Sequence, residues 1–379
     1  MADAVIVSTA RTPIGKAYRG AFNNTHGAAL GGHVIEHAVQ RAGLDPAEVE
    51  DVVLGCALPE GATGHNIARQ AAIRAGLPTT VSAMTVNRFC SSGLQAIAIA
   101  AQRVVLDGVP VAVAGGVESI SLVQNEHFNG YRLHEDWLVE HKPSIYYPML
   151  QTAEIVAARY QVGRDAQDAY ALASQQRTAE GQRAGRFDAE IVPVTERAEI
   201  RHDEGINGAL TAEDLAARKP AFRKGGTVTG GNSSPLNDGA AALLLMSADA
   251  VRRAGVTPLA RYVGSAAAGV HPDYMGIGPV PAMHKALGRA GWRLDEVDLI
   301  EINEAFAAQS VAVMDELKCD PGQVNVNGGA IAIGHPLGCS GARIVTTLLH
   351  EMRRRGAGRG AATMCIGVGQ GIASLWEAA

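Results

Sequence analysis

Apolar residues along the chain form short continuous runs, separated by longer stretches in which they recur with a helical period. The run at 83–87 predicts a buried strand, the Ala-, Ile- and Leu-rich stretch at 91–106 predicts a helix, and the run at 111–114 predicts another strand. Strands that alternate with helices are typical of parallel sheets whose faces are covered by helices. The pattern therefore predicts an α/β protein.

This pattern occurs twice. A helix end, an Arg-Ala-Gly turn and a buried strand at 41–54 recur with the same spacing at 289–302. A strand end and a Cys-Ser-Ser-Gly turn at 85–93 have a counterpart at 325–341, which is longer by a glycine-rich excursion. A terminal apolar strand follows in each copy, the second at 361–364. The chain is therefore predicted to contain two matched α/β halves.

The region between the two copies differs from both. Residues 124–149 mix Gln, His, Asn, Trp and Pro without a regular period, and 152–182 have a helical pattern. We infer an N-terminal half at 1–120, an inserted region at 121–233 that lies over the sheets, and a C-terminal half at 261–379.

Composition narrows the class of protein. The 379 residues are 47% hydrophobic and 19% charged, which allows a large core and excludes a disordered or fibrous chain. A net charge of −5 argues against nucleic-acid binding, and no run approaches the ~18 apolar residues of a membrane span. Five cysteines do not suit a disulfide framework, and the first residues lack the pattern of a signal peptide. We expect a cytoplasmic enzyme.

Cys90 is the strongest candidate for chemistry. It falls between a predicted strand and a predicted helix, where unpaired backbone N–H groups and the positive helix end favour a thiolate. A free cysteine with a pKa of ~8.5 is only a few per cent thiolate at neutral pH, so this environment matters for a nucleophile. From its position alone, a small buried residue beneath the helix is an equal alternative.

Two later segments add candidates. His335 lies in the glycine-rich counterpart of the Cys90 turn, and a His beside a Cys is the usual means of activating a thiol. Cys365 leads into spaced glycines, beginning with Gly367, whose N–H groups can bind an oxyanion. The alternatives are a structural histidine and a degenerate dinucleotide loop, but the spacing after Cys365 is not G-x-G-x-x-G.

Several other kinds of site are excluded by missing motifs. The chain has no G-x-x-x-x-G-K-[ST] and no C-x-x-C, so nucleotide-triphosphate and zinc sites are not expected. Asn303 and Glu304 follow a predicted strand, at the end where α/β sheets place their sites, although capping of the next helix would also explain them. Cys56, Cys319 and Cys339 lack such a context, and we interpret them as structural.

The motifs that combine these residues stand in a recognisable order. They are Val86-Asn87-x-x-Cys90-x-Ser92-Gly93, Gly231-Asn232-Ser233-Ser234, Asn237-Asp238-Gly239-Ala240-Ala241, Asn303-Glu304-Ala305-Phe306, Gly334-His335-Pro336 and Cys365-x-Gly367. Over its whole length the chain resembles the thiolase family of acyl-CoA:acetyl-CoA C-acyltransferases. The resemblance implies a five-layer α-β-α-β-α fold with an inserted loop domain, in which 234–260 return to complete the N-terminal half. It also implies a homodimer or homotetramer.

The resemblance implies a role for each candidate. Cys90 would attack the keto carbon of a 3-ketoacyl-CoA and carry the acyl group as a thioester, while His335 takes its proton. Cys365 would protonate the departing acetyl-CoA enolate, or deprotonate acetyl-CoA in the reverse Claisen condensation. One oxyanion hole would consist of His335 and a water held by Asn303, and the other of the N–H groups of Cys90 and Gly367.

Coenzyme A is implied as a substrate, together with acyl-CoA and acetyl-CoA, and neither a cofactor nor a metal is expected. Ser234 resembles the family's pantetheine contact. A basic cluster of Arg218, Lys219 and Arg223 precedes it, for which a solvated charged turn is the alternative. Asn207 stands where many family members have an arginine that contacts the adenine, so the chain departs from the family pattern at that contact.

The acyl pocket implied by the resemblance consists of Met149, Met275 and Phe306. Flexible methionines suit variable chains, although both could be ordinary core residues. The stretch 87–95 is closer to degradative 3-ketoacyl-CoA thiolases, and Pro148 replaces a histidine that is common in acetoacetyl-CoA enzymes of biosynthesis. We therefore expect thiolysis of medium-chain 3-ketoacyl-CoA in fatty-acid β-oxidation, with acetoacetyl-CoA thiolase as the alternative.

Two other classes are less consistent with the motifs. A thiolase-like acyl-CoA-binding protein without catalysis would need Cys90, His335 or Cys365 replaced, and none is. A ketoacyl-synthase-like condensing enzyme usually pairs its cysteine with two histidines, and the second cysteine argues against it. Val368 interrupts the C-x-G-G-G of many family members, but Gly367 is retained.

Overall fold

The computed structural model describes residues 3–194 and 200–379. Its strands are β1 (Ala4–Arg11), β2 (Gly15–Lys16), β3 (Asp51–Gly55), β4 (Ser82–Val86), β5 (Val111–Ser119), β6 (Asn237–Ser247), β7 (Ala260–Gly269), β8 (Leu299–Ile302), β9 (Arg359–Ile366) and β10 (Gln370–Ala378). Its helices are α1 (Gly27–Ala42), α2 (Ile67–Arg74), α3 (Ser92–Gln102), α4 (Ile120–Val123), α5 (Asp136–His141), α6 (Met149–Arg159), α7 (Arg164–Arg183), α8 (Ala212–Ala216), α9 (Ala248–Ala254), α10 (Pro279–Ala290), α11 (Ala307–Leu317), α12 (Ala330–Ile333) and α13 (Leu337–Arg355).

The strands form one mixed sheet in the order β4-β3-β5-β6-β1-β7-β10-β9-β8, with β2 beside β6. Its two halves meet where β1 pairs with β7, at Val5 with Arg261 and at Ile6 with Ala260. The order β3-β5-β6-β1 in the first half is repeated as β8-β9-β10-β7 in the second, and equivalent pairs run in the same relative direction. The duplication seen in the sequence is thus a duplication of topology.

The sheet is mixed, whereas the alternation of strands and helices had favoured parallel sheets. β9 and β10 are joined by the short turn at 367–369, and so short a connection joins only antiparallel strands. β6 enters from the inserted region and also runs antiparallel to its neighbours β5 and β1. The expected strand at 325–327 is not formed, because Asn325 has a φ of 44° and its side chain bonds both backbone groups of Ile302.

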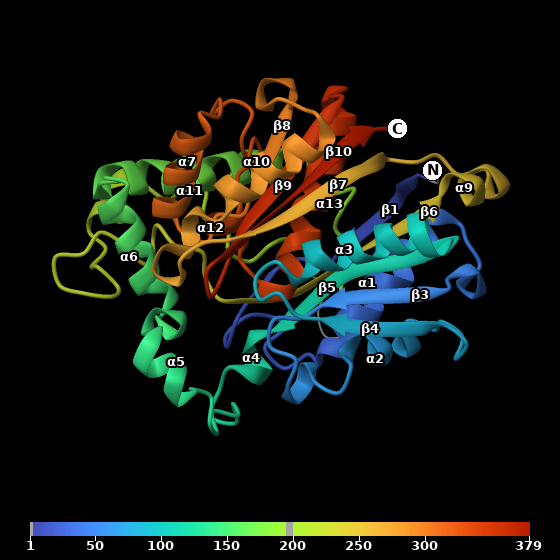
Figure 1. Ribbon diagram of the computed structural model, residues 1–379, viewed down its shortest axis with the longest axis horizontal. Coiled ribbons are helices and arrows are strands. Elements are labelled where there is room, and N and C mark those ends of the chain that lie inside the picture. The colour runs from blue at the N-terminus through green and yellow to red at the C-terminus, as the bar shows by residue number, and fades with distance from the viewer. Residues whose placement is uncertain (1–2, 195–199) are drawn as a thin grey trace.

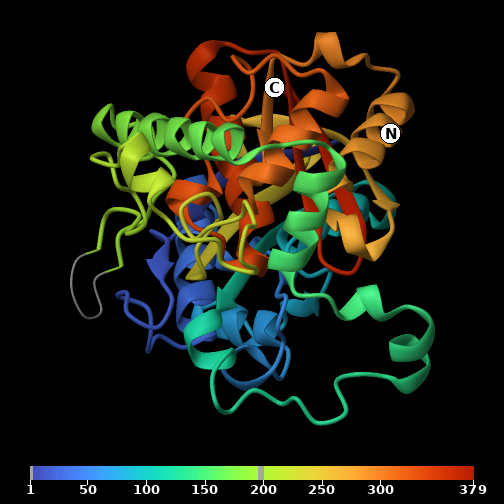
Figure 2. The same ribbon diagram turned by 90° about the vertical axis from the view of Figure 1, so that its left-hand side faces the viewer.

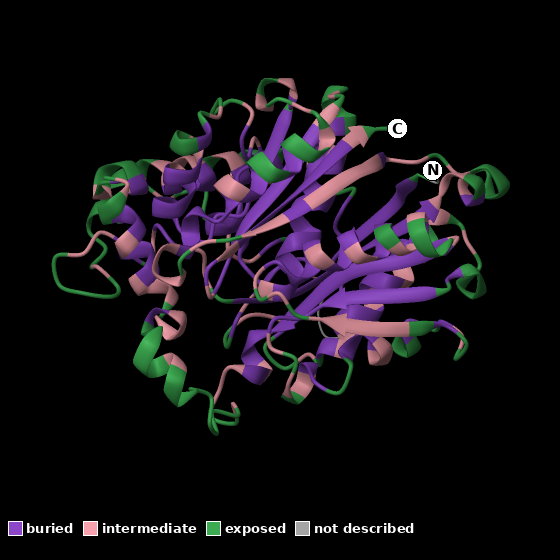
Figure 3. Cartoon of the chain, viewed as in Figure 1, coloured by how far each residue is buried: buried purple, intermediate pink, exposed green. Residues whose placement is uncertain are grey.

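Helices and sheet halves alternate in five layers, as the resemblance implied. α1 and α2 pack on the outer face of the first half, α10 and α11 on that of the second, and α3 and α13 lie between the halves (Figure 1). The strands between these helices are buried along most of their length (Figure 3). The continuous apolar runs in the sequence follow from this burial on both faces.

The middle layer contains the most apolar helix. In the described residues one stretch, Phe89–Asp107, is by length and composition apolar enough to cross a membrane, with a mean hydropathy of 1.3 over its best window. It comprises the turn before α3, α3 itself and a π-helical turn. Its apolar side chains pack against both halves of the sheet, which accounts for its composition.

The two middle helices touch at their first turns, where only glycine fits. A Cβ on Gly341 would lie 2.2 Å from the backbone nitrogen of Leu94, and one on Gly93 would lie 2.7 Å from the carbonyl oxygen of Gly338. A Cβ on Gly116 of β5 would lie 1.9 Å from that same oxygen. The backbones are therefore in direct contact, and the residues just before each helix are brought together.

The inserted region covers one end of the second half. The predicted single helical stretch at 152–182 is two helices, α6 and α7, because Gln161 between them has a φ of 56°. Both helices pack on α11, and the segment with α5 stands away from the main body (Figure 2). Arg11 of β1 fastens the region through buried ion pairs to Glu190 at 2.8 Å and Asp203 at 2.7 Å.

The glycine contact can be tested by adding one methyl group. Gly341→Ala is expected to destabilise the protein by about 1–3 kcal/mol, because the methyl overpacks the contact between α3 and α13. Gly288→Ala in α10 is the matched control, since nothing lies within 4 Å of its Cβ, and it is expected to stabilise by up to about 1 kcal/mol. Scanning calorimetry measures both; a Gly341→Ala Tm at or above wild type contradicts the contact.

Candidate active site

One cavity of about 120 Å³ collects the candidate residues from both halves. It is lined by Cys90, Met149, Ser234, Pro235, Leu236, Met275, Ala305, Phe306, His335, Leu337 and Cys365. The structure thus brings the three candidate catalytic side chains together with the three predicted acyl-pocket residues and Ser234. Most of the remaining lining is apolar, so a bound group would be shielded from water.

Cys90 lies in a sharp turn between β4 and α3, which we call the cysteine turn (87–92). Phe89 has a φ of 45°, an uncommon conformation for a bulky residue that reverses the chain just before the thiol. The Ser92 hydroxyl accepts a hydrogen bond from the Arg88 N–H at 2.8 Å and donates to the Phe89 carbonyl at 2.6 Å. The Asn87 amide oxygen accepts from the Phe89 N–H at 2.7 Å. These bonds hold the strained turn in place.

The prediction of a stabilised thiolate at Cys90 is wrong for the protein at rest. The backbone N–H groups of Gly367 and of Cys90 itself do lower the pKa of the thiol. Burial has the larger effect and raises that pKa to about 11. At neutral pH the group is therefore a thiol, and a base must take its proton before it can attack.

His335 stands where the chain leads into α13, in a segment that we call the histidine loop (334–338) and that includes the first two residues of the helix. Its Nδ1 lies 2.6 Å from the Ser340 hydroxyl, which donates its only proton to the Pro336 carbonyl at 3.0 Å. The hydroxyl must then accept from an N–H at Nδ1, which leaves the lone pair on Nε2. Nε2 lies 3.4 Å from the Asn303 amide nitrogen. The ring is thus held as a base at Nε2.

The protonation state of His335 agrees with this arrangement. Burial lowers the pKa of the imidazole to about 3, and the Arg343 guanidinium nearby acts in the same direction. The ring is neutral at physiological pH and is available to accept a proton.

Cys365 is the last but one residue of β9 and lines the same cavity, and Gly367 begins the turn to β10. Burial, and then the neighbouring Cys90, hold the pKa of the Cys365 thiol well above its usual range. In the turn, Val368 has a φ of 62° and Gly369 a φ of 87°. A β-branched residue in this conformation costs about 1–2 kcal/mol, so the turn is strained where Val368 departs from the family pattern.

Asn303 and Glu304 differ in what they contact. Asn303 is buried and faces His335, and its Oδ1 has no hydrogen-bond partner among the described residues. Glu304 does not cap α11, so that alternative is wrong for it. Its carboxylate accepts from the Ser174 hydroxyl at 2.6 Å and from the Ile331 N–H at 3.1 Å, tying α7 to α12 ahead of the histidine loop.

The candidate coenzyme A contacts are less closely gathered. Ser234 lines the cavity, and its hydroxyl donates to the Ala305 carbonyl at 3.0 Å. Arg218 and Lys219 are exposed and lie outside the cavity lining. The Arg223 side chain is 58% exposed, and its Nη2 lies 3.8 Å from Oε2 of Glu154.

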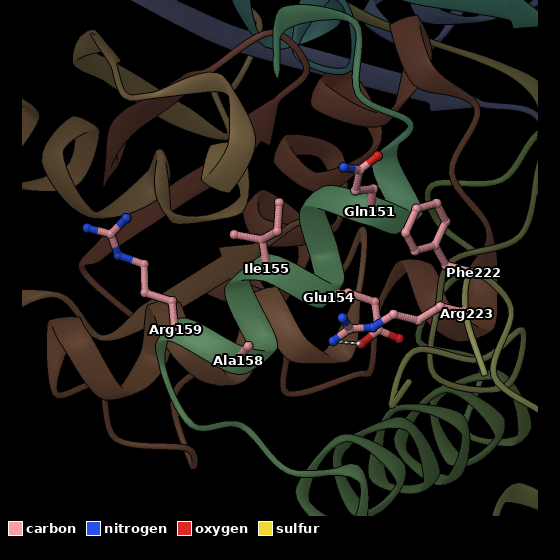
Figure 4. A pocket seen from close by; sticks show the side chains of 7 residues that line it. All are labelled: Gln151, Glu154, Ile155, Ala158, Arg159, Phe222 and Arg223. Atoms are coloured by element: carbon pink, nitrogen blue, oxygen red, sulfur yellow. Dashed lines mark ion pairs between the residues drawn. The ribbon is translucent and has the colours of Figure 1, made fainter. Parts of the chain in front are cut away.

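A separate surface cavity of about 480 Å³ lies between the outer face of α6 and residues 222–223 (Figure 4). It contains Arg223 but none of the candidate catalytic residues.

In residues 3–194 and 200–379, no group of three or more His, Cys, Asp or Glu is arranged to hold a metal ion.

Sequence reasoning missed three residues that shape the site. Ser340 orients His335, and its signal was its place in the repeated Cys-Ser-Gly motif. Leu236 lines the cavity and pairs with His335 as an isolated bridge, for which the sequence carries no signal. Glu118, fully buried at the end of β5, was recognisable only as a charge within an apolar strand.

Comparison with known proteins identifies a family whose models match nearly the whole chain. Residues 4–249 match the family model described as "Thiolase, N-terminal domain" and residues 256–378 match "Thiolase, C-terminal domain". The chain is 48% identical to an acetyl-CoA acetyltransferase of Paracoccus denitrificans and 45% identical to a 3-ketoacyl-CoA thiolase of Bacillus subtilis, in each case over the full length of both chains. It resembles the structure of human mitochondrial 3-ketoacyl-CoA thiolase in complex with CoA at a TM-score of 0.92 and 39% identity, covering 100% of this chain and 99% of that one.

The lowered pKa of His335 predicts acid sensitivity. The unfolded chain takes up a proton at this residue near pH 6.5 and the folded protein only near pH 3, so stability is lost as the pH falls through that interval. The free energy of unfolding of His335→Asn is expected to fall less over the same pH range, as measured by the urea midpoint at each pH. Replacement of His127, whose side chain is 82% exposed, should leave the dependence of the urea midpoint on pH as in wild type. Equal slopes for His335→Asn and wild type would contradict burial of a neutral ring.

Proposed function

The chain belongs to the thiolase family and is an acyltransferase, and we propose that it cleaves 3-ketoacyl-CoA into acetyl-CoA and a shortened acyl-CoA, as in fatty-acid β-oxidation. The observation that carries this proposal is the convergence of Cys90, His335 and Cys365 on one apolar cavity. Each has a protonation state suited to a different step.

In the first half-reaction His335 Nε2 takes the proton of Cys90 as its sulfur attacks the keto carbon. The bond between the α and keto carbons then breaks, and its electron pair passes to the acetyl-CoA enolate. The thiol of Cys365, kept protonated by burial, supplies the proton that turns the enolate into acetyl-CoA. The acyl group remains on Cys90 as a thioester.

The second half-reaction releases the acyl group. The Cys365 thiolate takes the proton of coenzyme A, whose sulfur attacks the acyl carbon. Cys90 leaves as a thiolate and recovers its proton from His335. Read backwards, the same transfers begin a Claisen condensation, so one site serves both directions.

Two sets of donors are available for the negative oxygens. Once protonated, His335 Nε2 can donate to the oxygen on the attacked carbon, and Asn303 stands beside it. The backbone N–H groups of Cys90 and Gly367 converge at the thiol and can donate to a thioester oxygen there. We assign these as the two oxyanion sites.

The acyl chain is accommodated by Met149, Met275 and Phe306, and Ser234 contacts the pantetheine arm. Two methionines support a pocket that adapts to several chain lengths. The basic residues Arg218, Lys219 and Arg223 are proposed to attract the phosphates of coenzyme A from the surface.

Acetoacetyl-CoA formation from two acetyl-CoA is the second candidate. The cavity of about 120 Å³ favours it, because this space suits a short acyl group without rearrangement of the methionines. The name of the Paracoccus denitrificans relative agrees with that activity.

Removal of the nucleophile tests the mechanism. Cys90→Ala is expected to lower thiolysis of 3-ketoacyl-CoA by at least about 10³-fold, because no acyl-enzyme can form. Mass spectrometry after addition of substrate should detect the acyl adduct on Cys90 in wild type and none in the variant. Cys319→Ala, at a partly exposed cysteine outside the cavity, is the control. Thiolysis retained in Cys90→Ala rejects the assignment.

Chain length is tested by comparing kcat/KM for acetoacetyl-CoA with that for 3-ketoacyl-CoA of six to ten carbons. If the pocket adapts, the longer substrates are cleaved at least as efficiently as acetoacetyl-CoA; a preference of orders of magnitude for acetoacetyl-CoA selects the second candidate. Met275→Ala enlarges the cavity and should shift the preference toward longer chains. Met283→Ala removes an equally buried methionine from another core cluster and should not.

A further inference from the structure

Glu118 is a buried carboxylate that the steps above do not use. It lies near the end of β5 with no exposed surface. One carboxylate oxygen accepts from the Ala57 N–H at 2.8 Å and from the Gly338 N–H at 2.7 Å. The other accepts from the Leu58 N–H at 3.2 Å and faces the Cys56 thiol at 3.7 Å. Its donors therefore come from both halves of the chain.

On one side Glu118 connects to the cysteine turn. Ala57 donates its N–H to the carboxylate, and its carbonyl accepts a hydrogen bond of 3.0 Å from the Asn87 amide. The oxygen of the same amide accepts from the Phe89 N–H, immediately before Cys90. A series of hydrogen bonds through Ala57 and Asn87 thus connects the carboxylate to Phe89, the residue before the nucleophile.

On the other side Glu118 connects to the histidine loop. Gly338 is in the first turn of α13, whose N–H groups are unpaired within the helix and whose dipole favours a negative charge. A Cβ on Gly338 would lie 2.9 Å from both the Glu118 carboxylate and the Ala57 nitrogen. The approach is therefore possible only with glycine. His335 precedes Gly338 by three residues.

We propose that Glu118 is a positioning residue of the acyl-transfer site, whose single carboxylate holds the cysteine turn and the histidine loop in register across the contact between the two halves. The proposal rests on the proposed function, because it concerns the geometry in which His335 takes the proton of Cys90. A shift of either segment lengthens that proton transfer, and a misplacement of about 1 Å can cost about 10²-fold in rate.

The charge of Glu118 has a second effect on the site. The titratable groups that respond to it are thiols: Cys56 after β3, Cys90 in the cysteine turn and Cys339 in α13. Burial raises the pKa of Glu118 to about 7, and its carboxylate raises the pKa of Cys90. Burial is the main reason that Cys90 is a thiol, and an ionised Glu118 adds a smaller effect in the same direction.

The test compares Glu118→Asp and Glu118→Gln with wild type in two assays. Glu118→Asp keeps the charge but shortens the reach, so its carboxylate cannot accept from both Ala57 and Gly338 in the same way. Its kcat for thiolysis is expected to fall by about 10- to 100-fold with little change in KM. Glu118→Gln can keep the oxygen that accepts both of these bonds, and it removes the charge. In this variant, alkylation of Cys90 by iodoacetamide at pH 7, followed by peptide mapping, is expected to become faster, by about tenfold for each unit by which its pKa falls.

Glu154→Gln is the matched control, because Glu154 is also buried and accepts two backbone N–H bonds, from Thr227 and Val228. It should leave Cys90 alkylation at the wild-type rate. In Glu118→Asp, which keeps the charge, alkylation of Cys90 should stay near the wild-type rate while kcat falls.

A kcat within twofold of wild type in Glu118→Asp overturns the positioning role. Unchanged alkylation in Glu118→Gln overturns the effect of its charge. Absence of thiolysis in wild type would instead reject the proposed function, and the alkylation assay would still decide whether Glu118 acts on Cys90.

Discussion

The backbone contact between the first turns of α3 and α13 determines where everything at the site lies. These helices belong to opposite halves of the chain, and glycines at 93, 338 and 341 let them touch without intervening side chains. Each candidate catalytic segment is the chain that leads into one of these helices. A methyl group at the contact would separate the helices and, with them, Cys90 from His335. Site geometry and core packing are therefore the same constraint.

The two halves have equivalent helix first turns, but the reactive residues that precede these turns differ. Ser92 and Ser340 occupy corresponding first turns, and each hydroxyl bonds back to the segment before its helix. In the first half this bond closes the turn that contains the Cys90 thiol. In the second half it orients the Ser340 hydroxyl, which in turn holds the His335 ring. Glu118 then joins these two segments. The halves thus repeat a scaffold, while the reactive groups differ.

Burial gives the site its electrostatic character. The two thiols and the imidazole that line the cavity are all held in their neutral forms, because a charge there would lose its hydration. Charges then appear only as protons move between neighbours, next to backbone N–H groups that are already in place. A site of this kind depends on correct spacing more than on a permanently reactive group, which is why positioning residues matter.

Features that depend on local backbone and periodicity were readable from the sequence alone: the two copies, the helix ends at Gly43 and Gly291, and candidates at strand ends such as Cys90 and Cys365. These follow from short-range sterics and from which face of an element is apolar. The direction of β6, the neutral state of Cys90 and the bonds of Glu118 were decided by tertiary structure. They arise from contacts between residues far apart in the chain and from the removal of water, which no local pattern records.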